Sequence, residues 1–342
     1  MRYPFLKRLM KFYESYQSDV RLLVLDSSPE DPDDEELQEL LSRDHVTWEK
    51  YDSSIFFANK ILEASKFIET EYAVLCADDD FLIPTALTDC VNFLKNNQDY
   101  VSVHGLYFHH TNAEEADKNG FSIGPLYQNG SSSEQNSAED RINAYLSGET
   151  GYYPMYAVHR KELFQRIWTE TTNFVSDWGL SELFPCSLSF IYGKMKVLPV
   201  FYSSREPNYY TWFDEDRHRE MYTEEKIQLA AEGIGKHLSI IDDTDAERSL
   251  SVGVHALNTY LCRSEKKIAN RNNRYVTIWS CLRKSIGFRT RLRKIFLNGC
   301  HPSIYPEYIE DFTKLKQAVM SSNIPLEELN KSRKYYAAQN NQ

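Results

Sequence analysis

The sequence predicts an α/β fold, with an open, mostly parallel sheet flanked by helices and a C-terminal, mainly helical module. Two observations lead to this prediction. From about residue 4 to about residue 110, segments with helical periodicity alternate with short apolar runs typical of strands. After about Tyr222, by contrast, the sequence shows no convincing strand pattern. We therefore divide the chain into residues 1–221, which carry the sheet, and residues 222–342, which we expect to be helical.

The first part of the sheet region alternates most clearly. Apolar stripes predict helices over Pro4–Tyr16, over Ser54–Ile68 with Ser54 as N-cap, and over 83–97 with Pro84 near its start. The run 71–77 is almost continuously apolar, which is typical of a strand buried on both faces. A short helix is expected in the acidic segment 29–44, and the remaining strand patterns cover 19–28, 45–52 and 99–110.

The second part is interrupted by a polar stretch. Residues 111–140 are rich in Asn, Ser, Glu and Asp, so we expect a long flexible loop there. A strand and a helix follow within 151–168. Residues 176–204 then read as a helix, a turn at Gly193 and a last strand.

Composition and charge narrow the class of protein. The formal net charge is -11, which argues against nucleic acid as a partner because phosphate backbones require a basic surface. The six cysteines are scattered without a CxxC pair, so we expect a reducing, cytoplasmic compartment and no zinc site of that spacing. No apolar run approaches the roughly 18 residues of a membrane span.

Three successive carboxylates, Asp78, Asp79 and Asp80, follow the apolar run 71–77. The carboxyl ends of parallel strands share one edge of a sheet, so we expect this cluster to lie near Asp26, which ends an earlier strand. Such carboxylates could bind a hard divalent cation that in turn holds a diphosphate. They could equally form a solvated acidic turn that caps the following helix. The apolar strand before the cluster favours the metal site.

The stretch FFANKILEASKFIETEYAVLCADDDFLIP, residues 56–84, resembles the nucleotide-sugar segment of family-2 glycosyltransferases of the GT-A fold. That pattern has an Asn-containing helix, a hydrophobic strand, an acidic DxD-type motif and a proline. The resemblance covers roughly residues 2–205 and is closest to a bacterial subgroup with a triple Asp. It implies a GT-A-like sheet. The matching residues are Asn59, Tyr72, Asp78, Asp80 and Pro84.

The resemblance implies a metal-dependent transfer of a sugar from a nucleoside-diphosphate sugar, with a UDP-sugar as the favoured donor. The acceptor would be a glycan or a lipid-linked molecule, and the setting would be the assembly of a surface polysaccharide. Mn²⁺ or Mg²⁺ would be bound by Asp80 with help from Asp78. The donor would be contacted by Asp26, Asn59, Asp78 and Asp79. The family also has an additional first strand that we expect to be absent from this chain.

An inverting transfer needs a carboxylate that deprotonates the acceptor hydroxyl. In the family an acidic motif opens a helix about eleven residues before a glycine turn. Counting back from Gly193 gives Glu182, and Asp177 is the second candidate. The usual Glu-Asp pair is missing here. Ordinary alternatives are a carboxylate on a helix face for Glu182 and an N-cap for Asp177.

The segment after the last predicted strand adds further candidates. Arg205 could pair with the diphosphate of the donor, and His218 could add a metal ligand. The aromatic residues Tyr209, Tyr210 and Trp212 could stack on a sugar. The alternatives are a surface ion pair for Arg205, packing for the aromatics and a solvated His218.

Residues 263–294 contain eleven Lys or Arg and one acid, Glu265. This basic stretch could contact the inner face of an anionic membrane, or form a solvated helix face. Two further functions stay open. A non-catalytic glycan-binding or scaffold protein derived from a transferase would explain the missing Glu-Asp pair. A sugar-phosphate nucleotidyltransferase is disfavoured because no Gly-rich phosphate loop is present.

Overall fold

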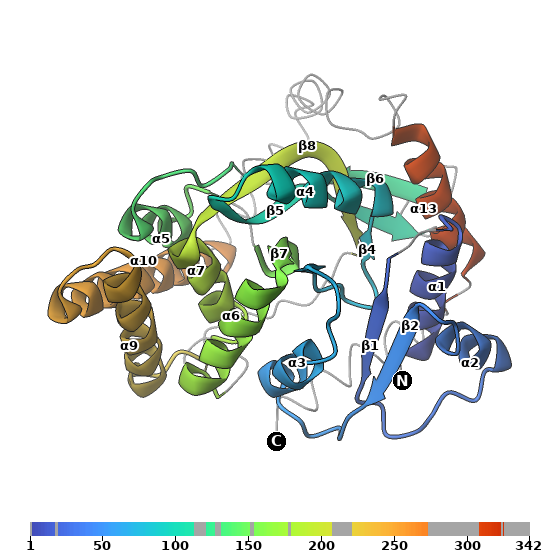
Figure 1. Cartoon of the computed structure of the whole chain (residues 1–342), viewed down its shortest axis with the longest axis horizontal. Coiled ribbons are helices and arrows are strands. Elements are labelled where there is room, and N and C mark those ends of the chain that lie inside the picture. Colours follow the sequence, from blue (N-terminus) through green and yellow to red (C-terminus); the bar gives the residue numbers. More distant parts are fainter. Residues whose placement is uncertain are drawn as a thin grey trace.

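The computed structural model describes residues 2–17, 20–112, 121–126, 131–150, 154–176, 179–206, 221–272, 308–322 and 324. Over these residues the chain forms a mixed α/β fold in which helices flank a curled sheet (Figure 1). No helix in these ranges is long and apolar enough to cross a membrane.

The N-terminal part forms a small layer of its own beside the main sheet (Figure 1). Its two strands pair in parallel and make a separate two-stranded sheet. Helices on this layer enclose a small core that includes Tyr3, Met10 and Leu37. The elements are α1 (Tyr3–Glu14), β1 (Leu22–Asp26), α2 (Glu35–Leu41) and β2 (Val46–Lys50).

The main sheet has six strands in the order β3-β7-β5-β8-β4, with β6 paired to β5. The helix α3 (Phe57–Ser65) precedes it, and α4 (Pro84–Asn96) follows β4 and packs on β5. Pro84 occupies the first turn of α4, as predicted. The strands are β3 (Tyr72–Ala73), β4 (Phe81–Leu82), β5 (Tyr100–Asn112), β6 (Phe121–Pro125), β7 (Val158–Arg160) and β8 (Lys194–Arg205).

The expectation of a mostly parallel sheet is met only in part. The pairs β1–β2 and β5–β8 are parallel. The other pairings, β3–β7, β4–β8, β5–β6 and β5–β7, are antiparallel. Apolar periodicity identifies a strand but not its direction. The consecutive strands β5 and β6 pair side by side without a helical crossover, which makes them antiparallel.

Two local predictions were wrong. The run 71–77 forms a ladder only over Tyr72–Ala73 and is half-buried, because β3 is an edge strand and has a neighbour on one side only. Ser54 does not cap α3, which begins at Phe57 after the N-cap Phe56. The Ser54 backbone N–H instead donates to Asp52 Oδ1 at 2.8 Å, which forms a local turn before the helix.

The predicted loop 111–140 contains regular structure. Its described residues include β6, which pairs with the end of β5, and the start of α5 (Ala138–Ser147), capped by Ser137. The strand β6 was not predicted, because its five residues carry no strong apolar run. Residues 113–120 and 127–130 lie outside the described part of the chain.

The next elements agree with the predictions for 151–204. A short 3₁₀ helix at Pro154–Tyr156 leads into β7 and α6 (Lys161–Phe174). The helix α7 (Leu183–Tyr192) then ends at Gly193, where the chain turns into β8. A Cβ added at Gly193 would lie 2.4 Å from Val101 Cγ1, so only glycine fits this close approach.

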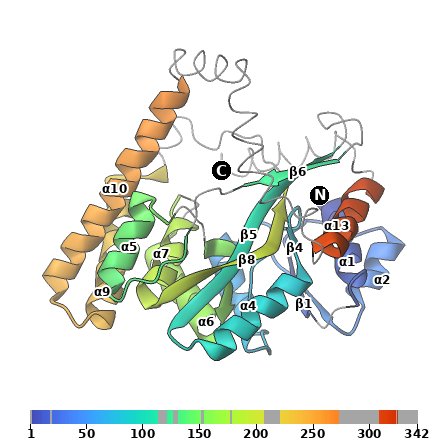
Figure 2. The ribbon, with the colours of Figure 1, turned by 90° about the horizontal axis from the view of Figure 1, so that it is seen from above.

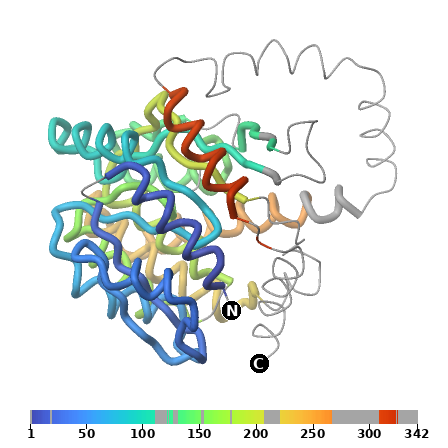
Figure 3. The backbone as a smooth tube through the Cα atoms, turned by 90° about the vertical axis from the view of Figure 1, so that its right-hand side faces the viewer, coloured from blue at the N-terminus to red at the C-terminus, as the bar shows by residue number. Residues whose placement is uncertain are grey.

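The described residues after 221 are helical, as predicted. The helices α9 (Glu224–Ile241) and α10 (Ala246–Asn272) pack on each other and on α5 and α7 (Figure 2). By contrast, α13 (Ile309–Ser321) lies beside α1 (Figure 3), at the end of the molecule opposite α9 and α10 (Figure 1). Thr85 Oγ1 donates to Asp311 Oδ2 of α13 at 2.8 Å. Residues of all three helices belong to the same hydrophobic core as the sheet, so the boundary at 221/222 does not separate two cores.

Arg141 of α5 ties this helix to the end of α7. Its side chain is buried, and its Nε and Nη2 donate to the carbonyls of Phe190 and Ile191 at 2.7 and 2.9 Å. Its Nη1 donates to the carbonyls of Gln135 and Asn136 at 2.8 and 2.7 Å. The last carbonyls of a helix have no partner within it, so one guanidinium here satisfies the end of α7 and the segment before α5 together.

We therefore expect Arg141→Met to lower the free energy of unfolding by about 3 kcal/mol, because buried carbonyls lose their donors. Urea denaturation followed by circular dichroism measures this. The control is Arg248→Met, which removes an exposed ion pair to Glu139 and should cost less than about 1 kcal/mol. Equal losses in the two variants would contradict the role of Arg141.

Candidate functional site

The three aspartates lie in a short turn between β3 and β4, which we call the acidic loop (residues 77–80). The Asp80 backbone N–H donates to the Ala77 carbonyl at 3.1 Å and closes the turn. The next residues, Phe81–Ile83, are fully buried and separate the loop from α4, whose N-cap is Ile83. The aspartates therefore do not cap that helix, and the alternative of a simple capping turn is wrong.

Arg2 neutralises two of the carboxylates. Its Nε donates to Asp78 Oδ1 and Oδ2 at 2.8 and 2.7 Å, and its Nη2 also contacts Asp78 Oδ1. The same Nη2 lies 2.8 Å from Asp79 Oδ2. Burial raises the pKa of the Asp78 carboxyl, while the charge of Arg2 opposes that rise. Asp78 and Asp79 thus converge on one positive charge that comes from the residue before α1.

Asp80 is held by a different cation. Its carboxylate accepts from Arg205 Nε at 2.7 Å and from the Glu206 backbone N–H at 3.2 Å. The Asp80 side chain is only 7% exposed. Burial raises the pKa of its carboxyl to about 7, although the neighbouring Arg205 works in the opposite direction. Hydrogen bonds to Asp80 therefore hold the acidic loop at the end of β8.

A second arginine of α1 reaches the loop from within the core. Arg8 is 5% exposed, and its Nη2 donates to the Asp79 carbonyl at 3.1 Å and to Glu206 Oε2 at 2.7 Å. Its guanidinium lies over the ring of Phe81, 5.0 Å from the centroid. Within the part of the chain that the structure describes, the buried Nε atom of Arg8 has no hydrogen-bond partner, so this guanidinium has spare donor capacity beside the loop.

Asp26, at the end of β1, is buried in a hydrogen-bonded network. It accepts from the Tyr3 hydroxyl at 2.7 Å and from the Ser28 backbone N–H at 2.8 Å. Lys50 Nζ and Trp48 Nε1 lie at 3.2 and 3.3 Å. Burial would raise the pKa of the Asp26 carboxyl, but these donors together lower it. Asp26 is thus ionised, with much of its bonding capacity already used.

The structure brings Asp26 close to the acidic loop. Consecutive residues of the chain hold the two: Arg2 binds Asp78, and Tyr3 binds Asp26. Lys60 of α3 lies nearby, with its Nζ 2.8 Å from Ser27 Oγ. Burial lowers the pKa of Lys60, while the charges of Asp26 and Asp78 raise it. The two acidic strand ends do not share one edge of a sheet, because they belong to different sheets. They are linked instead through Arg2 and Tyr3 at the start of α1.

Glu182 lies exposed immediately before α7. Its link to the acidic loop is Tyr156, whose ring lies 4.6 Å from the guanidinium carbon of Arg205. The pKa of the Tyr156 phenol is raised by burial first and then by the negative charge of Glu182, and Asp80 adds to the rise. Tyr156 is therefore within electrostatic reach of both the loop and the candidate base.

The remaining predicted residues are less informative. Asn59 lies exposed on α3, next to Lys60. The second base candidate, Asp177, lies outside the described residues, as do the metal candidate His218 and the aromatic residues Tyr209, Tyr210 and Trp212. Of the basic stretch 263–294, the structure describes only the part up to Asn272, at the end of α10.

Sequence reasoning missed four residues of this site: Arg2, Arg8, Lys60 and Tyr156. Of these four, Arg8 could have been recognised from the sequence. Arg8 falls on the same helical stripe as the buried Phe5 and Phe12, and a charge on an apolar stripe requires a partner. The other three follow from contacts between distant parts of the chain.

The donor set of the loop fits a hard divalent cation in its chemistry. Within the described ranges there is no cluster of three or more His, Cys, Asp or Glu side chains arranged to hold a metal. Mg²⁺, however, is often bound by one or two carboxylates, with waters and substrate phosphates completing the shell. Asp78 and Asp79, which converge on Arg2, are such a pair. Asp80 points to Arg205 instead.

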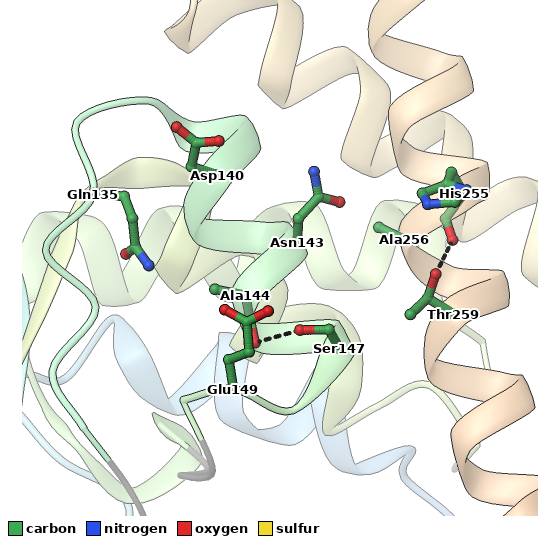
Figure 4. Close-up of a pocket in the computed structure, with 9 residues that line it drawn as sticks. All are labelled: Gln135, Asp140, Asn143, Ala144, Ser147, Glu149, His255, Ala256 and Thr259. Carbon is green, nitrogen blue, oxygen red and sulfur yellow. Dashed lines mark hydrogen bonds between the residues drawn. The ribbon is translucent and has the colours of Figure 1, made fainter.

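A separate pocket of about 510 Å³ lies between α5 and α10 (Figure 4). Its lining is mostly polar, and it contains none of the residues of the acidic loop. Two of its hydroxyls are bonded within their own helices: Ser147 to the Ala144 carbonyl and Thr259 to the His255 carbonyl. The lining residues are Gln135, Asp140, Asn143, Ala144, Ser147, Glu149, His255, Ala256 and Thr259.

Solved structures that are similar to this chain include two of S. aureus TarS. The crystal structure of S. aureus TarS 1–349 superposes with a TM-score of 0.47 at 13% identity, over 78% of this chain and 69% of that one. The crystal structure of S. aureus TarS gives a TM-score of 0.39 at 14% identity, over 69% and 41%. No family model and no curated protein matches the chain.

The raised pKa of Asp80 predicts a pH dependence of stability. A carboxyl whose pKa is higher in the folded protein binds its proton more tightly there. Its contribution to stability is therefore full below its unfolded pKa of about 4 and is lost as the pH rises to about 7. From pH 4 to pH 8, Asp80→Asn should thus gain stability relative to the native chain by at least about 1 kcal/mol.

Urea denaturation of both proteins at several pH values, in buffer with EDTA, measures this difference. Titrating groups far from Asp80 are common to the two proteins and cancel in the comparison. A difference that stays constant from pH 4 to pH 8 would contradict the assignment.

Proposed function

We propose that the protein is a glycosyltransferase that moves a sugar from a nucleoside-diphosphate sugar to a glycan or lipid-linked acceptor. The sequence resemblance of residues 56–84 supports this proposal. The observation that carries it is the placement of Arg205. Arg205 pairs with Asp80, and its guanidinium lies over the ring of Tyr156. The negative charge of Glu182 contributes to the raised pKa of the Tyr156 phenol. The contact of Arg205 with both Asp80 and Tyr156, together with the effect of the Glu182 charge on Tyr156, supports a site that contains both the candidate diphosphate anchor and the candidate base.

The donor would bind at the meeting point of β1 and the acidic loop. Asp26 and Asn59 would contact the nucleoside, with Asp26 already oriented by Tyr3 and Lys50. The cationic groups of Arg205 and Lys60 would bind the diphosphate, since guanidinium groups match phosphate geometry. A UDP-sugar is the donor that we propose.

The proposed metal is Mn²⁺ or Mg²⁺. The resemblance assigns the ligands to Asp80 and Asp78, with His218 as a further candidate, and the convergence at Arg2 supports Asp78 and Asp79. When bound, such an ion neutralises negative charge on the departing diphosphate. The chain's own Arg205 supplies positive charge at the same loop.

The transfer would proceed with inversion. Glu182 would accept the proton of the acceptor hydroxyl, whose oxygen attacks the anomeric carbon as the bond to the nucleoside diphosphate breaks. The exposed position of Glu182 at the start of α7 is open to an acceptor. Asp177 is the alternative base. We propose that the reaction takes place in the cytoplasm and contributes to the assembly of a surface polysaccharide. Residues 263–294 are the proposed contact with the inner face of the membrane.

One observation favours a second function, a non-catalytic glycan-binding protein derived from a transferase. Each carboxylate of the acidic loop already has an arginine partner within the chain. The negative charges of such a loop are balanced by arginines of the chain, without a bound metal ion or a bound nucleotide sugar. Binding of glycans without any metal-dependent binding of nucleotides, measured by calorimetry, would select this second function.

A panel of nucleotide sugars with Mn²⁺ tests the transferase directly. We expect hydrolysis or transfer with at least one donor. Asp80→Ala should weaken donor binding about tenfold or more, because Arg205 loses the carboxylate that positions it. The control is Asp99→Ala, an exposed carboxylate that pairs with Lys194. If no donor binds and Asp80→Ala changes nothing, the proposal fails.

Glu182→Gln tests the assignment of the base. Removing a general base should lower kcat by about 10²- to 10⁴-fold and leave KM for the donor nearly unchanged. Glu225→Gln, which alters an exposed carboxylate at the start of α9, should have normal activity. Full activity of Glu182→Gln together with a large loss in Asp177→Asn would move the role to Asp177.

A further inference from the structure

Arg2 occupies the place where a cation would be held by the acidic loop. Its guanidinium touches both oxygens of Asp78 and one oxygen of Asp79. Two neighbouring carboxylates repel each other unless a positive charge lies between them. In this chain that charge is Arg2, so a divalent cation at the same two carboxylates and the guanidinium are alternative occupants of one position.

The surroundings of Arg2 allow it to leave. It is the N-cap residue of α1, with φ and ψ of -99° and 12°, so its backbone lies outside the regular helix. Its side chain is 19% exposed, and the Asp78 and Asp79 side chains are 30% and 25% exposed. The guanidinium also lies 4.9 Å from the ring centroid of Phe5. A rotation of the Arg2 side chain therefore vacates the carboxylates without unfolding α1.

The other arginine of α1 behaves differently. Arg8 is 5% exposed and stays fixed by Glu206 and the Asp79 carbonyl. Its buried Nε has no hydrogen-bond partner among the described residues, so one donor of this guanidinium is unused there. Arg8 therefore keeps a permanent positive charge and an unused donor beside the loop, while Arg2 is the exchangeable charge.

We propose that Arg2 competes with a divalent cation for Asp78 and Asp79, and so sets the affinity of the loop for that cation. The identification of the loop as a cation site rests on the proposed function. The competition itself does not require any donor or acceptor. The apparent dissociation constant of the cation is the intrinsic one divided by the fraction of molecules in which Arg2 has moved away. Removing the guanidinium makes this fraction equal to one.

The test is the binding of Mn²⁺ alone to the full chain, followed by the electron paramagnetic resonance signal of free Mn²⁺. Compared with the native chain, Arg2→Gln should bind Mn²⁺ at least about tenfold more tightly. The matched control is Arg43→Gln, which removes the same charge from pairs with Glu14 at the other end of α1 and with Glu39 of α2. It should bind Mn²⁺ as the native chain does.

Two further variants locate the effect. Asp78→Asn added to Arg2→Gln should abolish the gained affinity. Arg2→Lys, which keeps the charge but loses the two-pronged contact, should give an intermediate affinity. Thermal unfolding provides a second measurement: Arg2→Gln should unfold at a lower temperature than the native chain without metal, and Mn²⁺ should restore it.

Equal Mn²⁺ affinity in the native chain and Arg2→Gln overturns the proposal, and so does the absence of Mn²⁺ binding to both. Neither result decides the transferase, which is tested by donor binding and turnover. Conversely, tight Mn²⁺ binding to Arg2→Gln without hydrolysis of any nucleotide sugar would support the competition and contradict the transferase.

Discussion

The pairing of arginine with aspartate at the acidic loop is the interaction on which the rest of the site depends. Three adjacent carboxylates, one of them almost fully buried, would repel each other and lose hydration without compensation. The chain compensates them from two directions: α1 supplies Arg2 and Arg8, and the end of β8 supplies Arg205. The loop therefore has its shape only when the first helix and the last strand of the sheet are both in place.

The same pairings connect the two sheets. The β1–β2 layer and the six-stranded sheet share no strand pairing in the described chain, but their acidic ends are held by the neighbouring residues Arg2 and Tyr3. A change in the angle of α1 would move both contacts together. The position of Asp26 relative to Asp78 is thus fixed by one helix end, not by the hydrogen bonds of a common sheet.

Much of the fold could be predicted from local patterns. The helices α1 and α4, the turn at Gly193 and the helical character after Tyr222 each depend on neighbouring residues. Local patterns could not predict the directions of β4 and β7 or the shortness of β3. These features depend on which strand lies alongside in the folded sheet. The sequence shows that the three aspartates form a cluster. It does not show their partners, because Arg2 and Arg205 are 76 and 125 residues away from the aspartates that they hold.

The packing of α13 against α1 has a consequence for how the protein is made. The helix α1, which carries Arg8 and is preceded by its N-cap Arg2, is synthesised long before α13, which begins only at Ile309. Domains fold during synthesis as their segments emerge, and contacts of long sequence separation form last. Until α13 has been made, α1 is therefore exposed on the face that α13 later covers. A nascent chain stalled before Ile309 lacks the helix that packs on α1, so we expect Arg2 and Arg8 to hold the aspartates less firmly there than in the chain that contains α13.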